Sequence, residues 1–356
     1  MTQRSDTDVA TTERPAGGLA HRAGRGEEEA GFPELTDGYR RELTAHCYRM
    51  TGSIHDAEDL VQETYLRAWR SFEGFEGRSS VRTWLYRIAT NVCLTALEGK
   101  DRRPLPTGLG GPASRPGDQL AQSNEITWLE PAPDPLVSGE SSDPATIVAE
   151  RESIRLAFVA ALQHLPARQR AVLILRDVLR WRASEVAGAL DTTEAAVNSA
   201  LQRAHAQLVK ADVSQDTLVT NLGPDKEAML ERYVKAFWEK DIQTIVGMLT
   251  ADAVWEMPPF TGWYSGAQDI GRLIDTQCPG GVHDMPMVAT TANGQPAYGL
   301  YMRQPDGTFA PFHLQVLTLR GGKVEHVAAF FDADLFATFG LPASLPADHV
   351  VGAGAP

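Results

Sequence analysis

The stretch WRASEVAGALDTTEAAVNSALQRAHAQL, Trp181–Leu208, contains two short helical patterns separated by a turn. Ser184 can cap the first helix, and Thr192 or Thr193 can cap the second. Apolar side chains recur on one face of the second helix at Val197, Leu201, Ala204 and Leu208. The opposite face is polar, and the whole pattern is that of a helix-turn-helix, whose second helix enters the major groove of DNA.

The polar face carries side chains that suit a contact with DNA. Asn and Gln can bond both polar edge atoms of adenine, and Arg suits phosphate oxygens. The predicted contact residues are Arg182, Thr193, Ala195, Asn198, Ser199, Gln202 and Arg203. An ordinary helical hairpin with a solvated polar face fits the same pattern, so the surrounding segments must decide between the two.

Length, charge and cysteine content limit the number of domains and the classes of function that the chain can have. At ~100 to 200 residues per domain, the 356-residue chain should hold two or three domains. The formal net charge of −13 disfavours DNA binding, but the two helical segments are the least acidic parts of the chain. Cys47, Cys93 and Cys278 lack the spacing of a zinc site or a disulfide framework, so we expect no metal and no cofactor. No apolar run is long enough to span a membrane and no signal-peptide pattern is present, which predicts a cytoplasmic protein without membrane contact.

Composition and periodicity divide the chain into six segments. We expect a disordered tail over 1–33, a helical unit over 34–98, an acidic Pro/Gly-rich linker over 99–146, a second helical unit over 147–212, an α+β domain with an antiparallel sheet over 224–341, and a flexible tail over 342–356. The first unit should contain helices over 36–51, 56–72 and 80–97. The linker should be solvated, with Ile126, Trp128 and Leu129 as its strongly apolar cluster.

The second helix of the first unit begins with a run of acids, Asp56, Glu58, Asp59 and Glu63. Four acids within two turns of a helix repel each other unless a basic partner relieves them. Taken alone, such a run is more often a solvated face. The apolar stripes place Trp69 and Trp84 toward the core of this unit.

Two long stretches resemble one bacterial protein family. DAEDLVQETYLRAWRSFEGFEGRSSVRTWLYRIATNVCLTAL resembles region two of the extracytoplasmic-function (ECF) sigma factors of the sigma-70 family, and LQHLPARQRAVLILRDVLRWRASEVAGALDTTEAAVNSALQRA resembles their region four. The resemblance covers about residues 36–210. It implies a protein that directs promoter-specific transcription initiation, in which the acidic run of the first unit docks on the clamp helices of the RNA polymerase core.

The same resemblance assigns DNA contacts to both helical units. It implies that the loop and helix from Phe75 to Asn91 open the minus-ten promoter element, where basic and polar groups suit exposed single strands. The candidates are Arg78, Ser79, Ser80, Arg82, Arg87 and Asn91. Region four would read the minus-thirty-five element. Cations that many family members carry in the recognition helix are missing here, so polymerase tethering would have to supply effective concentration.

The acidic linker and the C-terminal domain complete the resemblance. In this family the linker threads the basic interior of polymerase, although a plain flexible tether fits the sequence as well. Residues 226–340, with WEMPPFTGWYSG and PFHLQVLTLRGGKVEHVAAFFDADLFATFGLP, resemble the SnoaL-like α+β cone. This fold wraps a curved sheet around a pocket that is an enzyme site in polyketide cyclases and a binding or dimer surface elsewhere. Candidate pocket residues are Trp255, Met257, Trp263, His313 and Asp332.

Three functional hypotheses remain open at this point. His313 and Asp332 could form an acid/base pair of a cyclase or hydrolase, but a strand His is more often a satisfied sheet residue and Asp332 can cap the helix that follows it. A stand-alone helix-turn-helix regulator is a second alternative. We favour a non-enzymatic sigma factor whose SnoaL-like domain contacts region two or the linker and biases the protein between active and held states.

Overall fold

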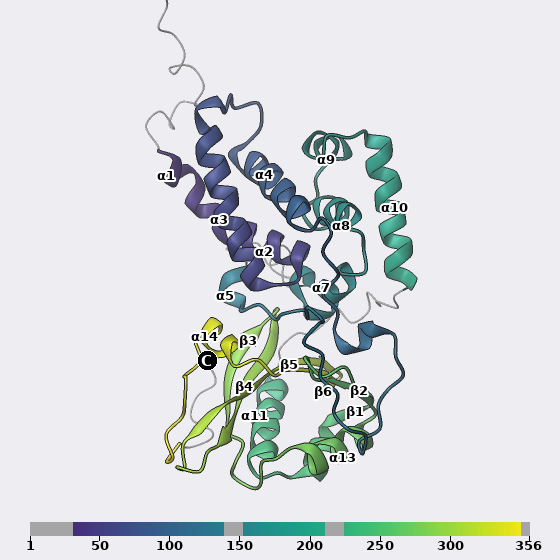
Figure 1. Cartoon of the computed structure of the whole chain (residues 1–356), viewed down its shortest axis with the longest axis vertical. Helices are drawn as coiled ribbons and strands as arrows, with labels where there is room; N and C mark the ends of the chain where they lie inside the picture. Colours follow the sequence, from purple (N-terminus) through teal and green to yellow (C-terminus); the bar gives the residue numbers. More distant parts are fainter. Residues whose placement is uncertain (1–30, 139–151, 211–223, 350–356) are drawn as a thin grey trace, which may run out of the picture.

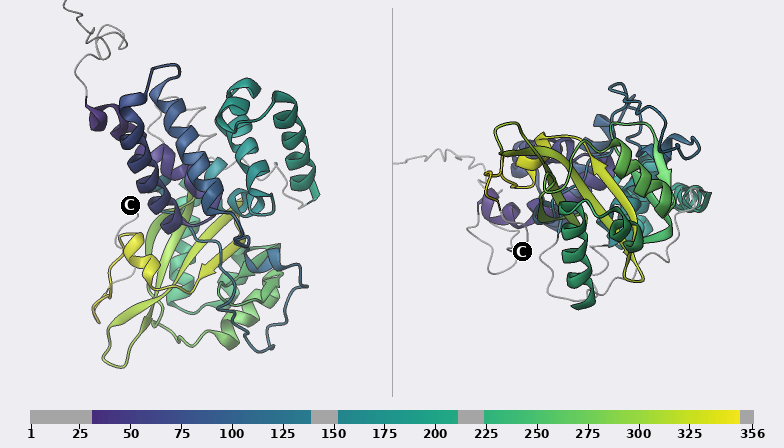
Figure 2. Two further views of the ribbon diagram at one scale, coloured as in Figure 1. Left: turned by 45° about the horizontal axis from the view of Figure 1, so that its top comes forward. Right: turned by 90° about the horizontal axis from the view of Figure 1, so that it is seen from below.

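The computed structural model describes residues 31–138, 152–210 and 224–349, in which two helical units stand on a sheet domain (Figure 1). The views in Figure 2 show the same arrangement from two further directions. The predictions for 1–30, 139–151, 211–212 and 350–356 lie outside the described residues. Among the described helices, none is long and apolar enough to cross a membrane.

The first helical unit agrees with the spacing of its apolar residues. Its elements are α1 Phe32–Thr36, the 3-10 turn η1 Asp37–Tyr39, α2 Arg40–Thr51, α3 Ile54–Ser71, the 3-10 turn η2 Phe72–Gly74 and α4 Val81–Ala96. Leu43, Cys47 and Met50 of α2 are fully buried, as their periodicity predicts. Ser80 caps α4, and its hydroxyl accepts a hydrogen bond of 3.1 Å from the backbone N–H of Thr83.

Phe32 and Trp69 differ from the expectation for this unit, whereas Trp84 packs against the core as predicted. Phe32 falls in the tail expected to be disordered, yet it is buried because its ring packs edge-on against Tyr65 and Trp69. Trp69 itself is 61% exposed, so it is not a core residue. Trp84 is half-buried and lies against Phe75, with 4.8 Å between ring centroids. Loop and tail residues absent from the helical periodicity therefore complete the packing of this unit.

The second helical unit contains the predicted helix-turn-helix. Its elements are α7 Leu156–Leu162, α8 Ala167–Leu173, the π-helical turn η4 Ile174–Val178, α9 Ala183–Ala189 and α10 Glu194–Lys210. Thr193 caps α10 by accepting from the N–H of Ala196, as expected. Ser184 does not cap α9, because the helix begins two residues earlier than such a cap requires, at Ala183. Arg182 is the N-cap, and its N–H is bound by the Glu185 carboxylate at 2.6 Å.

The C-terminal domain is an α+β fold with a six-stranded sheet. Its elements are α11 Pro224–Trp238, α12 Ile242–Met248, β1 Leu249–Glu256, β2 Trp263–Ser265, α13 Ala267–Gln277, β3 Met287–Ala292, β4 Gln295–Arg303, β5 Phe309–Arg320, β6 Lys323–Phe330 and α14 Asp334–Thr338. The strand order is β2-β1-β6-β5-β4-β3. The sheet is mixed rather than purely antiparallel, because β1 runs parallel to β6.

Local signals explain where these elements begin and end. The pair Gly321-Gly322 between two apolar runs predicts a two-residue hairpin, and in the structure both glycines have positive φ angles and join β5 to β6. The apolar spacing of Met229, Val234, Phe237, Ile245 and Leu249 predicts one helix, but the stretch is divided into α11 and α12. Lys240 adopts a left-handed conformation there, and Asp241 caps α12 by accepting from the N–H of Thr244.

Both faces of the sheet are covered. In β5, Leu314 and Val316 belong to the apolar cluster that includes the cores of the two helical units. Leu317 belongs instead to the cluster under α11–α13. The nearly continuous apolar runs of β5 and β6 therefore reflect burial on two sides, because a sheet with one solvated face would alternate apolar and polar residues.

The described part of the linker is not a solvated tether. Figure 1 shows it leaving α4, running along the sheet domain and returning to the helical units. It contains the 3-10 turn η3 Pro106–Leu109 and the short helix α5 Asp134–Val137. Leu105, Leu129 and Val137 are buried, so the apolar anchor predicted around Leu129 exists but is joined by others. Burial of this apolar area offsets the entropy of ordering the chain.

The described part of the C-terminal tail is also held in place. Leu345 is buried and exchanges two backbone hydrogen bonds with Phe309 of β5, each 2.9 Å long. The expectation of a flexible tail over 342–356 is therefore wrong at this position, because the apolar side chain of Leu345 is packed and its backbone is paired with β5.

Candidate functional site

The acidic residues of α3 differ in their solvent exposure and in whether they already form ion pairs within the chain. Glu58 and Asp59 are exposed. Glu63 forms an i,i+4 ion pair with Arg67 at 2.7 Å. Asp56 is partly buried, and its carboxylate lies 3.0 Å from the guanidinium of Arg103 in the linker. The basic partner that the acidic run requires is thus supplied in part by this chain itself.

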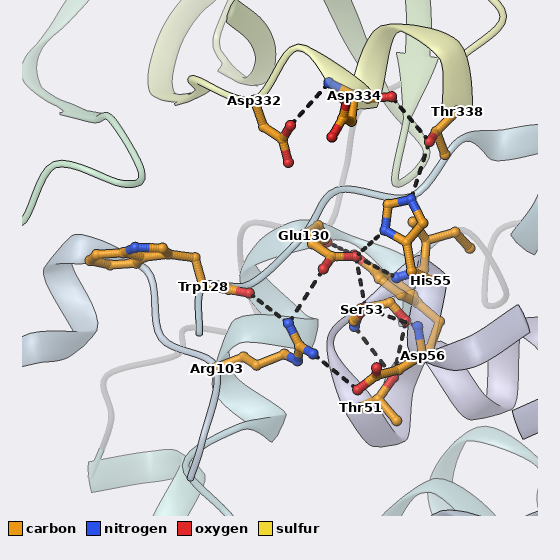
Figure 3. A network of polar contacts seen from close by, with 12 residues as sticks. Thr51, Ser53, His55, Asp56, Arg103, Trp128, Glu130, Asp332, Asp334 and Thr338 are labelled. Atoms are coloured by element: carbon orange, nitrogen blue, oxygen red, sulfur yellow. Dashed lines mark hydrogen bonds and ion pairs between the residues drawn. The ribbon is translucent and has the colours of Figure 1, made fainter. Parts of the chain in front are cut away.

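The linker contacts the beginning of α3 through a second group, Glu130 (Figure 3). Its carboxylate accepts hydrogen bonds from the Ser53 hydroxyl at 2.7 Å and the Ile54 N–H at 3.1 Å, and lies 3.0 Å from Nδ1 of His55. An acid at this position is stabilised by the unpaired N–H groups and the dipole of a helix N-terminus. The Nε2 atom of His55 lies 3.3 Å from Thr338 of α14, so the network reaches the C-terminal domain.

The minus-ten candidates lie along the loop before α4 and on the helix itself. Arg78, Ser79, Ser80 and Arg87 are exposed, whereas Arg82 and Asn91 are partly buried. Arg82 is engaged inside the unit: it pairs with Glu42 and its guanidinium lies 4.9 Å from the ring of Tyr86.

Region four lies directly against this surface. The guanidinium of Arg87 contacts the carboxylate of Asp191, in the turn of the helix-turn-helix, at 3.1 Å. The rings of Tyr86 and Trp181 pack edge-on with centroids 6.0 Å apart. The two candidate DNA-binding units therefore form one packed body in this structure.

The outward face of the helix-turn-helix agrees with the prediction. Arg182, Thr193, Ala195, Asn198, Ser199, Gln202 and Arg203 are all exposed. Val197 and Ala204 are buried against the unit's core. The apolar stripe thus orients the polar residues toward solvent, where a DNA duplex could reach them.

A buried side chain that sequence reasoning missed joins the three parts of the protein. Asn293, at the tip of the β3–β4 hairpin, is fully buried. Its Oδ1 accepts from the N–H of Ala132 in the linker at 2.9 Å. Its Nδ2 donates to the Tyr48 hydroxyl of α2 at 2.8 Å and to the carbonyl of Ile154, just before α7, at 2.6 Å.

A sequence signal for this hairpin exists in the dipeptide Asn293-Gly294. Both residues have positive φ angles, and Asn-Gly is among the strongest hairpin signals. It predicts the turn between β3 and β4, but it does not predict that the Asn side chain is inserted between the linker and the two helical units.

Further contacts reinforce the same junction. Arg170 of α8 is buried and donates to the backbone carbonyl of Met50 in α2. Burial lowers the pKa of this guanidinium to about 10. The backbone N–H of Leu156 donates to the side chain of Gln295 at 3.0 Å. Gly52, which ends α2 with a positive φ, has no room for a Cβ because the linker residue Leu129 would lie only 2.7 Å from it.

The C-terminal domain contains an apolar cavity of about 310 Å³. Trp255, Met257 and His313 line it, as predicted. Trp263 does not, because its indole N–H donates to the carbonyl of Gly111 in the linker at 3.1 Å. Asp332 is exposed, and its carboxylate accepts from the N–H of Asp334 at the start of α14. The hypothetical His313–Asp332 acid/base pair is therefore not assembled, and among the described residues no cluster of metal-ligating side chains is present.

Comparisons with known proteins agree with the two helical units. Residues 35–103 match the model of sigma-70 region 2, and residues 155–208 match that of sigma-70 region 4. The chain is 56% identical over 332 residues to the ECF RNA polymerase sigma factor SigG of Mycobacterium tuberculosis, which covers 92% of this chain and 89% of SigG. It is 29% identical over 303 residues to SigJ of the same organism, covering 80% of this chain and 86% of SigJ.

The fold is similar over nearly the same length. The crystal structure of Mycobacterium tuberculosis SigJ superposes with a TM-score of 0.55 at 24% sequence identity, covering 86% of this chain and 98% of that one. This similarity includes the C-terminal domain as well as the helical units. The extent of the identity to SigG and the match to both sigma regions show that this chain belongs to the ECF family of RNA polymerase sigma factors.

Proposed function

We propose that this sigma factor has a closed form, in which its C-terminal domain holds regions two and four and the linker together, and that it directs promoter-specific initiation after these units separate on the RNA polymerase core. The observation that carries the proposal is Asn293, whose one side chain bonds all three of the other parts. A sigma factor is a transcription factor, so the enzyme and stand-alone regulator alternatives are set aside.

Geometry supports a change of form between the free and the promoter-bound protein. Minus-ten and minus-thirty-five elements are about 25 base pairs apart, which corresponds to roughly 85 Å of B-form DNA. In the closed form the minus-ten helix α4 and the turn of the helix-turn-helix are in contact through Arg87 and Asp191. The two units cannot engage both elements in this arrangement, so their interface must open.

The linker supports the same conclusion. Arg103 and Glu130 contact the beginning of α3, the helix proposed to dock on the clamp helices of polymerase. Glu58 and Asp59 remain exposed on the next turn. We infer that these two acids make the first contact with the basic polymerase surface, and that a linker released from α3 can then follow the polymerase interior.

Fluorescence energy transfer between regions two and four tests the opening directly. Fluorophores placed at the exposed positions Glu73 and Ala206 should show high transfer in the free protein, because the units pack together. Addition of RNA polymerase core and promoter DNA should lower the transfer strongly. Unchanged transfer in a complex that makes transcripts would contradict the closed form, since the same arrangement would then be active.

The recognition helix gives a second test. Asn198→Ala and Gln202→Ala should each lower promoter-dependent transcription about tenfold, since one good base contact contributes about 1–3 kcal/mol of discrimination. Gln268→Ala, at an exposed position of α13, is the matched control. Transcription assays with single base changes across the minus-thirty-five element should show relaxed preference at one or two positions. If both variants keep the base preference of the wild type at every position, Asn198 and Gln202 do not read bases.

A further inference from the structure

The cavity of the C-terminal domain is bounded by two parts of the chain. Most of its wall comes from the sheet domain, with apolar side chains such as Leu273, Leu300 and Phe312. Leu120 and Gln122 of the linker complete the wall. None of the described residues that line the cavity is Asp, Glu, Lys or Arg. The linker between regions two and four is thus part of a pocket in a different domain.

Backbone hydrogen bonds hold the linker in this position. The N–H of Ser114 donates to the carbonyl of Trp263 at 2.7 Å, and the N–H of Thr261 donates to the carbonyl of Ala121 at 2.9 Å. The N–H of Ser123 donates to the carbonyl of Pro259 at 3.1 Å. Leu120 and Gln122 therefore keep their places in the wall only while the linker is docked.

The first unpaired polar group in the wall belongs to His313, which is 4% exposed. In the orientation that the Gln315 amide adopts, its Oε1 accepts from the Tyr233 hydroxyl at 2.8 Å and its Nε2 lies 2.8 Å from Nε2 of His313. An amide NH₂ can only donate, so the ring Nε2 accepts and the proton lies on Nδ1. That Nδ1–H has no hydrogen-bond partner among the described residues.

The second unpaired group is the indole N–H of Trp255, which is 3% exposed and also lines the cavity. It has no hydrogen-bond partner among the described residues. An indole N–H can only donate. Two buried donors without acceptors are costly in a native protein, and a bound group that accepts from them would remove this cost.

We propose that the cavity binds a neutral, mostly apolar small molecule carrying a carbonyl-type acceptor, which takes hydrogen bonds from Trp255 and His313 and packs against the docked linker. A carbonyl oxygen has two lone pairs, enough for both donors. An anion is disfavoured because it would lose its hydration without meeting a charged partner. Burial lowers the pKa of His313 to about 3, so the imidazole supplies no positive charge at neutral pH.

The position of the linker couples this site to the sigma units. A ligand that contacts Leu120 and Gln122 binds more tightly when the linker is docked, and it therefore stabilises the docked form by the same factor. This coupling rests on the closed form proposed above. The existence of the binding site does not.

The test uses the full-length protein and prodan, a neutral naphthyl ketone whose emission shifts to the blue in apolar surroundings. Prodan should bind with a blue shift, and the same naphthalene without its ketone should bind about tenfold more weakly, the loss expected for unmade hydrogen bonds. Trp255→Phe and His313→Phe should each weaken prodan binding by a similar factor and leave the ketone-free probe unaffected. Equal binding of the two probes, or of prodan to all three proteins, would overturn the site.

The linker contribution has its own variant and control. Leu120→Ala should weaken prodan binding, whereas Leu109→Ala, at an exposed linker position, should not. Addition of RNA polymerase core should release prodan from the wild-type protein. If prodan stays bound while energy transfer shows that the sigma units have separated, the coupling is wrong and the closed form stands. If the units never separate, the closed form is wrong. Binding of prodan and of its ketone-free analogue still tests the cavity site independently of that result.

Discussion

Asn293→Gly should open the closed form and raise promoter-dependent transcription at limiting sigma factor by about tenfold or more. The substitution removes three side-chain hydrogen bonds between units and keeps a residue that tolerates the positive φ of the turn. At about 0.5–1.5 kcal/mol each, these three bonds amount to about 1.5–4.5 kcal/mol. That is roughly a 12- to 2,000-fold shift in the ratio of open to closed protein.

In vitro transcription with purified core polymerase measures this effect, and energy transfer between regions two and four reports the opening. Asp306→Gly is the matched control: it removes the hydrogen bonds of the Asp306 carboxylate to Thr308, in the β4–β5 loop of the same domain. Raised transcription in the control would mean that any loosening of the domain suffices. An Asn293→Gly protein that binds polymerase but shows unchanged transfer and transcription would refute the junction as a restraint.

Reversing the exposed charges of α3 should weaken binding to the RNA polymerase core. Glu58→Arg combined with Asp59→Arg should weaken binding to the RNA polymerase core by at least about 30-fold, because disrupting a desolvated charge pair at an interface costs about 2–5 kcal/mol. Both residues are exposed in the closed form, so the fold should tolerate the change. A binding assay with purified core, repeated at two salt concentrations, gives the affinity and its electrostatic part.

Glu227→Arg combined with Glu231→Arg, at two exposed positions of α11, controls for the same change in net charge. Glu63→Arg should have a smaller effect than the double reversal, because Glu63 already forms an ion pair with Arg67. Core binding that is equal in the wild type and in the double variant would exclude this face of α3 from the polymerase contact.

The helical units show which features the spacing of apolar residues can predict and which it cannot. The polar face of α10 is exposed because Val197 and Ala204 have the spacing of a buried stripe, and this spacing is visible in the letters alone. The same reasoning placed Trp69 in the core and was wrong, since periodicity specifies a direction on the helix but not how much neighbouring structure covers it.

The pocket shows the same limit. The resemblance to the SnoaL-like cone placed Trp255, Met257 and His313 in a pocket, and they line the cavity. Asp332 and Trp263 were predicted beside them and point elsewhere. Asp332 satisfies a backbone N–H of the next helix, and Trp263 binds a linker carbonyl more than a hundred residues away in the chain.

Amphipathic spacing, capping residues and the match of two long stretches to one family were enough to identify the helical units, the sheet domain and the sigma factor family before any coordinates. These features depend on neighbours within a few residues, whose relative positions follow from helix and strand geometry. The docking of the linker, the insertion of Asn293 between three units and the contact of Arg87 with Asp191 depend on surfaces that come together from distant parts of the chain. Such contacts are set by the packing of whole units, where many side chains must fit at once, and no local pattern encodes that fit.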